Sequence, residues 1–166
     1  MEPVKFLVDS MAGKLARWLR MLGFDAEYER SGDPELLIRR AVSEDRVILT
    51  RNLKFRKIRV PRSVKVFFLS SEKTNLQVRE VVEKFGLVHH IRPFTRCIEC
   101  NVELEKVKNK EDVKLKVPYF VYITHDEFSI CPKCHRIYWK GTHTKAMIDR
   151  IELVLGEELA KKIRHF

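Results

Sequence analysis

The chain has 166 residues, of which 45% are hydrophobic, so it can bury a core and is not a disordered polypeptide. No apolar run is long enough to span a bilayer, and the first residues, MEPVKFLVDSMAG, lack the layout of a signal peptide, which is basic and then apolar. The sequence therefore predicts a cytoplasmic protein without a membrane partner.

The chain is strongly basic, with a formal net charge of +10. Such a balance favours polyanionic partners, above all nucleic acid. The stretch from Arg46 to Lys65 holds eight basic residues and no acidic one, so it repels itself unless a negative partner approaches. The alternative is a composition typical of thermophile proteins, because the chain is rich in Lys and Glu and has a single Gln.

Short apolar runs alternate with amphipathic segments through the first half of the chain. Strong stop and start signals separate them: Gly23 and Gly86 each end a helical pattern, and Asp33-Pro34 opens one. This alternation predicts an α/β fold with a parallel sheet flanked by helices, followed by a C-terminal helix. The expected strands are 4–8, 24–28, 46–50 and 64–69, and the expected helices are 10–22, 34–43, 74–85 and 143–164.

Four cysteines form two pairs, Cys97/Cys100 and Cys131/Cys134, each with two residues between the thiols. A tight turn of this length aims both sulfurs at one ion, and two turns complete the tetrahedron of a closed structural zinc site. Disulfides or a redox pair are the alternatives, but disulfides are rare in the cytosol and both pairs lie outside the α/β part. The pattern indicates a zinc ribbon, with strands expected near 113–117 and 119–124.

Polar side chains follow the predicted strands. Asp9 ends the first strand, Asn52 follows the third, and Asp33 opens a helix. In a parallel sheet these residues share one edge, where clustered oxygens bind Mg²⁺ or Mn²⁺ for phosphodiester cleavage. The alternative is that Asp9 and Asp33 only cap helices. Asp25 and Asp45 precede strands, so we expect them at the opposite edge in structural roles.

Basic residues accompany the carboxylate edge. Lys14 and Arg17 share a stripe of the first helix near that edge, and the basic stretch from Arg51 begins there, so both are expected to contact phosphates. An ordinary solvated helix face is the alternative for Lys14 and Arg17. Trp18 and Trp139 are candidates for stacking on bases, although the spacing of Trp18 favours burial.

Several motifs together resemble one family. DSMAGKLARWLRMLGFDAEY, then DPELL and RVILTRN, resemble the Mut-seven C-terminal RNase domain, a PIN-like nuclease family that carries a zinc ribbon. RCIECNVELEKV and VPYFVYITHDEFSICPKCHRIYWKGTH resemble the ribbon of that family and the segment after it. The resemblance covers roughly residues 4–150 and rests on the order and spacing of separate motifs.

The resemblance implies a PIN-like domain over 1–92, a zinc ribbon over 93–141 and a C-terminal helical segment over 142–166. It also implies RNA cleavage that depends on a divalent metal, with Asp9 and Asp33 as acids of the active site. Where the family usually reads LTRD, this chain has Asn52, which brings no charge and lowers the expected metal affinity. His143 lies in a matching segment as a candidate phosphate contact or proton donor, and the alternative is an ordinary cap at the surface.

The favoured hypothesis is an endoribonuclease that uses Mg²⁺ or Mn²⁺ and carries a structural Zn²⁺. Asp9 and Asp33 would hold the ion, with Asn52 as a weaker ligand or a group that orients the water. The alternative is a catalytically weak or inactive RNA-binding protein associated with ribosomal or transfer RNA, which Asn52 favours. A protein–protein adaptor is a third reading. The residues expected to bind RNA are Lys14, Arg17, Arg51, Lys54, Arg56 and His143.

Overall fold

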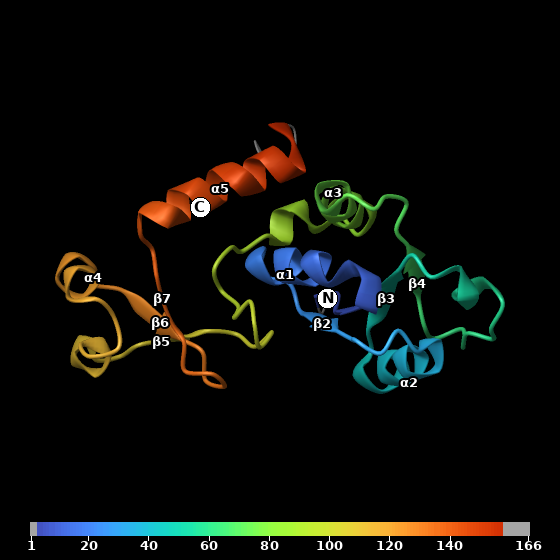
Figure 1. Ribbon diagram of the computed structural model, residues 1–166, viewed down its shortest axis with the longest axis horizontal. Helices are drawn as coiled ribbons and strands as arrows, with labels where there is room; N and C mark the ends of the chain where they lie inside the picture. The colour runs from blue at the N-terminus through green and yellow to red at the C-terminus, as the bar shows by residue number, and fades with distance from the viewer. Residues whose placement is uncertain (1–2, 158–166) are drawn as a thin grey trace.

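The computed structural model describes residues 3–157, apart from the side chains of Thr142 and His143. Its main body is a four-stranded parallel sheet with the strand order β2-β1-β3-β4 (Figure 1). The central strands β1 and β3 are buried on both faces, which explains why they read as unbroken apolar runs. The predicted α/β class is confirmed. In chain order the strands are β1 (Phe6–Val8), β2 (Ala26–Tyr28), β3 (Val47–Thr50) and β4 (Val66–Phe68).

Helices cover both faces of this sheet. Helices α1 (Gly13–Met21) and α3 (Thr74–Lys84) lie on one face, and α2 (Pro34–Glu44) lies on the other (Figure 1). The alternating side chains of β1 divide accordingly: Phe6 joins the core beneath α1 and α3, whereas Leu7 packs with the core beneath α2. Short 3₁₀ helices complete this part at η1 (Ser10–Ala12), η2 (Leu53–Arg56) and η3 (Leu87–His90).

The C-terminal helix α5 (Thr142–Leu155) returns to the main body and packs against α3. Its residues Ile151, Val154 and Leu155 belong to the core beneath α1 and α3. The helix begins where the sequence predicts, and the part of the predicted range beyond 157 lies outside the described residues. No helix in the described chain is long and apolar enough to cross a membrane.

The cysteine-bearing part forms a second, antiparallel sheet with the order β5-β6-β7, set to one side of the main body (Figure 1). The strands are β5 (Glu105–Lys106), β6 (Phe128–Ile130) and β7 (Ile137–Trp139). A small core of Val113, Val117 and Phe128 supports them.

The strands predicted near 113–117 and 119–124 are wrong. Lys110–Val113 forms a 3₁₀ helix (η4), and Tyr119–Thr124 forms the helix α4. Pro118 starts α4 with φ fixed at −55°, and the first turn closes when the Tyr122 amide donates to the Pro118 carbonyl at 3.0 Å. The β-branched and aromatic residues here suggested a strand, but β5, β6 and β7 pair with one another and leave this segment outside the sheet.

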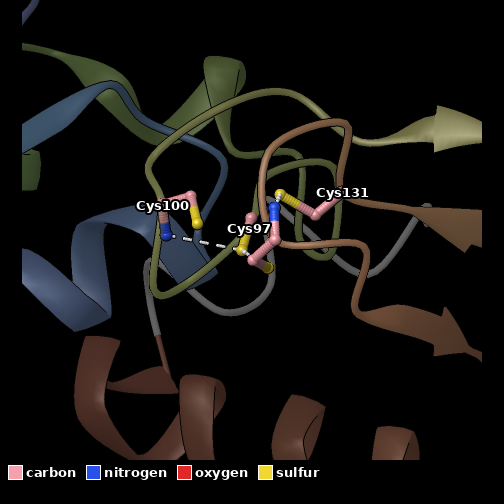
Figure 2. Close-up of side chains that lie close together, drawn as sticks. Cys97, Cys100 and Cys131 are labelled. Atoms are coloured by element: carbon pink, nitrogen blue, oxygen red, sulfur yellow. Dashed lines mark hydrogen bonds between the residues drawn. The ribbon is translucent and has the colours of Figure 1, made fainter.

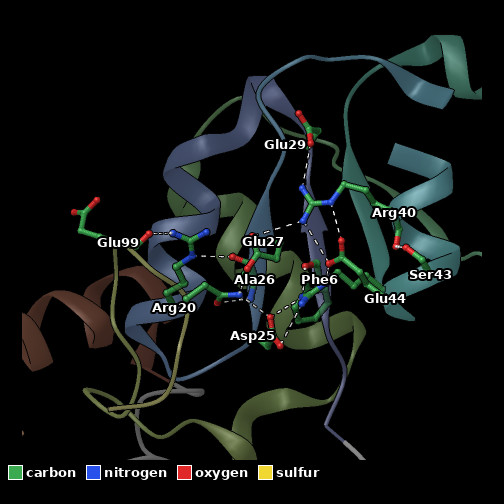
Figure 3. Close-up of polar contacts among 12 residues, drawn as sticks. Phe6, Arg20, Asp25, Ala26, Glu27, Glu29, Arg40, Ser43, Glu44 and Glu99 are labelled. Carbon is green, nitrogen blue, oxygen red and sulfur yellow. Dashed lines mark hydrogen bonds and ion pairs between the residues drawn. The ribbon is translucent and has the colours of Figure 1, made fainter. Parts of the chain in front are cut away.

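The first cysteine loop is fastened to the edge strand β2. Asn101, only 5% exposed, accepts a hydrogen bond from the Ala26 amide at 2.9 Å and donates to the carboxylates of Asp25 (2.7 Å) and Glu27 (2.9 Å). From α1, the buried Arg20 donates to the carbonyls of Ala26, at 2.7 Å, and of the same loop (Figure 3). The two sheets are therefore held together by polar contacts to backbone and carboxylate groups.

An ion-pair network continues from this contact along β2 to the arginines at and after α2 (Figure 3). Arg46 donates to Asp25 at 2.6 Å and to Glu44, and Arg40 pairs with Glu44 and Glu29. Burial raises the pKa of Asp25, but hydrogen bonds from Arg46 and Asn101 outweigh it, so this pKa lies below its ordinary value. Arg46, the first residue of the basic stretch, thus has a structural partner.

Candidate functional site

The four cysteines form one cluster in which every sulfur lies within 4.8 Å of the others (Figure 2). Cys97 and Cys131 are buried, Cys100 is half-buried and Cys134 is exposed. Cys97 Sγ and Cys134 Sγ, which come from different pairs, lie 3.8 Å apart. Four thiolates at these separations match the donor set and number that Zn²⁺ takes in closed structural sites. Across the described residues, no other group of three or more His, Cys, Asp or Glu side chains gathers at ligand distance.

The two cysteine loops have the same backbone geometry, which explains why their sulfurs converge. In each loop the amide of the second cysteine donates to the sulfur of the first at 3.4 Å. The next residue, Asn101 or His135, then adopts a left-handed conformation with φ of 61° or 59°. Its amide donates back to the carbonyl of the first cysteine at 2.9 Å in both loops. The CxxC spacing thus encodes a turn whose amides orient the thiolates.

Tyr138 on β7 completes the surroundings of Cys97 by donating its hydroxyl to the sulfur at 3.2 Å. Burial raises the pKa of Cys97, but the bonds from Tyr138 and the loop amides outweigh it and lower this pKa to about 6. Burial and the neighbouring thiols raise the pKa of Cys100 to about 12. Full ionisation of four thiols this close requires a cation, as expected of a metal site.

Asp9 lies at the carboxyl end of β1 and is completely buried. Its Oδ1 accepts from the Ser10 amide at 2.7 Å and from the Ser10 hydroxyl at 3.2 Å. Its Oδ2 accepts from the buried Thr50 hydroxyl at 2.6 Å. Both oxygens of this carboxylate are therefore held within the protein, as expected for a buried charged group.

Asn52 connects to Asp9 through Thr50. The backbone N–H of Asn52 donates to the Thr50 hydroxyl at 2.8 Å. One chain of hydrogen bonds therefore runs from the residues after β3 to the Asp9 carboxylate at the end of β1. The Asn52 side-chain oxygen accepts from the Lys54 amide at 3.0 Å and caps η2. The side chain of Asn52 therefore caps η2 in this conformation, and its backbone N–H points toward the Asp9 network.

Asp33 caps α2 through a hydrogen bond that its Oδ1 accepts from the Glu35 amide at 3.0 Å, and its side chain is exposed. The preceding Gly32, with φ of 66°, lies against the Ser10 side chain: a Cβ at Gly32 would stand 2.9 Å from the Ser10 hydroxyl. This close approach sets the start of α2 beside the segment that carries Asp9. Asp9, Asp33 and Asn52 thus share the carboxyl edge of the sheet, while Asp25 and Asp45 lie at the other end.

Two of the basic residues of the sequence prediction form ion pairs at the surface of the protein. Arg17 forms an ion pair with Glu99 of the first cysteine loop at 2.8 Å, and Arg51 pairs with Glu72 at 2.9 Å. Lys14 and Lys54 are exposed, and Arg56 lies over the Phe68 ring at 5.2 Å. His143 falls in the first turn of α5, and its side chain lies outside the described part. The exposed cations follow the edge that carries Asp9 and Asn52.

Three residues around the cysteine cluster were not predicted from the sequence. Arg20 and Asn101 join the cysteine loop to the main body, and Tyr138 contacts Cys97. The position of Asn101 directly after a CxxC pair offered one signal, because Asn adopts the left-handed conformation more readily than most residues. Trp18, as its spacing suggested, is partly buried against the main core, with Arg150 over its ring at 5.7 Å.

Comparison with known proteins agrees with the family resemblance drawn from the motifs. Residues 4–151 match the sequence model of the family described as Mut7-C RNAse domain, which covers essentially the whole chain. No curated protein and no solved structure matches the chain. The match includes both the parallel sheet with Asp9 and the cysteine cluster.

Proposed function

Because the chain belongs to the Mut7-C RNAse domain family, we propose that it is a metal-dependent endoribonuclease with RNA as its substrate. The observation that carries the proposal is the family match over residues 4–151. The placement of Asp9, Asp33 and Asn52 at one sheet edge supports it, because open parallel sheets bind ligands at this edge.

The oxygen atoms of Asp9, Asp33 and Asn52 are of the chemical type that Mg²⁺ and Mn²⁺ bind. These cations take carboxylate and amide oxygens and keep several waters, so Asp9 and Asp33 would hold the ion and Asn52 would add a neutral oxygen or orient a water. When bound, such an ion supplies Lewis-acid stabilisation of the charge that develops on phosphate oxygens. Because Asp9 is fully buried, an ion reaches its carboxylate only after a neighbouring group such as the Ser10 hydroxyl turns away.

RNA would lie along the exposed cations beside this edge. Lys14, Lys54 and Arg56 offer charges to the phosphate backbone, and the exposed Lys57 and Arg59 follow them in the chain. The zinc ion that we propose for the four cysteines is structural, because all four of its positions are filled by thiolates.

The test is cleavage of labelled single-stranded and structured RNA by the wild type and by Asp9→Asn, with Mn²⁺, with Mg²⁺ and without added metal. Asn keeps the size of the buried side chain and removes its charge. We expect cleavage that requires the added metal and disappears in Asp9→Asn, while RNA binding persists in both proteins. Cleavage at equal rates by both proteins would contradict the proposed site.

A second function, RNA binding without cleavage, is favoured by two observations. Asn52 stands where the resembled family usually has an acid, and the Asp9 carboxylate is closed to solvent. In that case both proteins bind RNA with strong salt dependence and neither cuts it. The same assay therefore separates the two functions.

A further inference from the structure

A cavity of about 600 Å³ lies away from the carboxyl edge, between the cysteine-bearing sheet, residues 93–98 and the start of α5. This volume falls within the range of sites that take small organic ligands. Aromatic and other apolar side chains contribute much of its lining: Met21, Phe94, Phe128, Trp139 and Met147. Figure 1 shows the three chain segments that surround it: β5–β7, the start of α5 and the connection from η3 to the first cysteine loop.

Cations also line the cavity. The Arg96 guanidinium is held by the Asn101 carbonyl at 2.6 Å and by Glu103, whereas Lys106 and Lys140 are exposed. Asp126 and Glu127 line the same cavity. Asp126 already pairs with Lys110 at 2.9 Å. A carboxylate is an acceptor of the kind that base amino groups need and it repels a free anion, so the lining suits a base with its flanking phosphates better than phosphate alone.

Phe94 is the residue that sets this cavity apart. Its φ is +64°, in the left-handed region that a bulky side chain rarely adopts. Its amide donates to the Met21 carbonyl at 3.3 Å, and Gly23, with φ of 94°, permits the close approach of the Arg92 carbonyl. Glycine would adopt this backbone conformation without strain. The chain instead has a strained phenylalanine here, which places an aromatic ring on the cavity wall.

We propose that this cavity binds an unstacked base of single-stranded RNA, with Phe94 and Trp139 as its aromatic walls and Lys106 and Lys140 on the flanking phosphates. This inference rests on the proposed function and adds a second RNA contact. Helix α1 connects the two sites: Asp9 precedes the helix, and Met21, which ends it, lines the cavity. The separation along the helix is roughly 15 Å, which a few nucleotides of single-stranded RNA span.

Phe94→Gly is the decisive variant, because it removes the ring and relieves the backbone, so the fold is retained. The titration follows Trp139 fluorescence in a Trp18→Phe background as a six-nucleotide RNA is added without divalent metal. We expect Phe94→Gly to weaken binding roughly tenfold, as when an aromatic stacking partner is lost, and Phe94→Tyr to restore it. We expect Lys106→Glu and Lys140→Glu to weaken binding as well and to reduce its salt dependence.

Two matched control substitutions lie in the cysteine-bearing part of the chain but outside the cavity. Phe120→Ala removes an aromatic ring that is 71% exposed on α4, and Lys108→Glu reverses an exposed charge. Both should bind the RNA as the wild type does. Wild-type affinity in folded Phe94→Gly, or an equal loss in Phe120→Ala, overturns the inference.

The outcome is independent of cleavage. If the wild type cuts RNA and Phe94→Gly binds and cuts normally, the base-binding cavity is wrong and the proposed nuclease stands. If the wild type cuts no RNA but Trp139 still responds to the oligonucleotide in a manner that depends on Phe94, the cavity stands and the proposed nuclease falls.

Discussion

The attachment of the cysteine loop to β2 offers a prediction that can be tested without RNA. Asn101 makes three side-chain hydrogen bonds, to the Ala26 amide and to the carboxylates of Asp25 and Glu27, while its own φ is 61°. Asn101→Gly keeps that backbone conformation and removes all three bonds. His135 holds the same place in the second loop, with φ of 59° and an exposed side chain. His135→Gly is therefore a matched control.

The magnitude follows from the bonds lost. At about 1 kcal/mol for each net hydrogen bond, Asn101→Gly should cost about 3 kcal/mol relative to His135→Gly. The backbone relief of introducing glycine is common to both variants and cancels in the comparison. For a chain of this size, the difference corresponds to a melting temperature lower by about 6–12 °C.

The assay is thermal unfolding of the three proteins with saturating zinc, followed by circular dichroism. We expect His135→Gly to melt close to the wild type and Asn101→Gly to melt well below both. Equal melting temperatures for the two variants would refute the idea that Asn101 joins the loop to the sheet.

Three further predictions concern the metal cluster and the ion pairs. The purified protein should hold one zinc per chain by metal analysis, and Cys131→Ser should lose it; a metal-free, fully folded wild type would contradict this. Tyr138→Phe, which removes the donor to Cys97, should weaken zinc binding about tenfold in competition with a chelating dye. Because the pKa of Asp25 is lowered in the folded state, its contribution is present above about pH 4 and is lost as the pH falls. Arg46→Met should therefore show a smaller loss of stability between about pH 4 and pH 2 than the wild type, as measured by urea unfolding.

Features with a strong local signal were predictable from the sequence. The parallel sheet follows from apolar runs that alternate with amphipathic segments, and the cysteine cluster follows from two CxxC pairs whose loops fold alike without reference to the rest of the chain. Asp33 caps α2 as its position before Pro34 indicates.

Features set by tertiary context were not predictable. Residues 119–124 carry the side chains of a strand, yet they form α4, because Pro118 favours a helix start and β5, β6 and β7 build the sheet without this segment. Arg20 lies on a helix face that the sequence cannot distinguish from a solvated one, and only the fold brings the 98–99 carbonyls to it. The complete burial of Asp9 likewise depends on how Thr50 and Ser10 meet across two elements.

We propose that a divalent ion bound by Asp9 and Asp33 supports RNA cleavage despite the neutral Asn52. The most direct measurement is the cleavage rate of one labelled RNA as Mn²⁺ is titrated, for the wild type, Asp9→Asn and Asn52→Asp. We predict that Asn52→Asp reaches half-maximal rate at a lower Mn²⁺ concentration than the wild type, because a third carboxylate beside Asp9 and Asp33 strengthens metal binding, and that Asp9→Asn cuts nothing. No cleavage by the wild type or by Asn52→Asp at any Mn²⁺ concentration would contradict the claim.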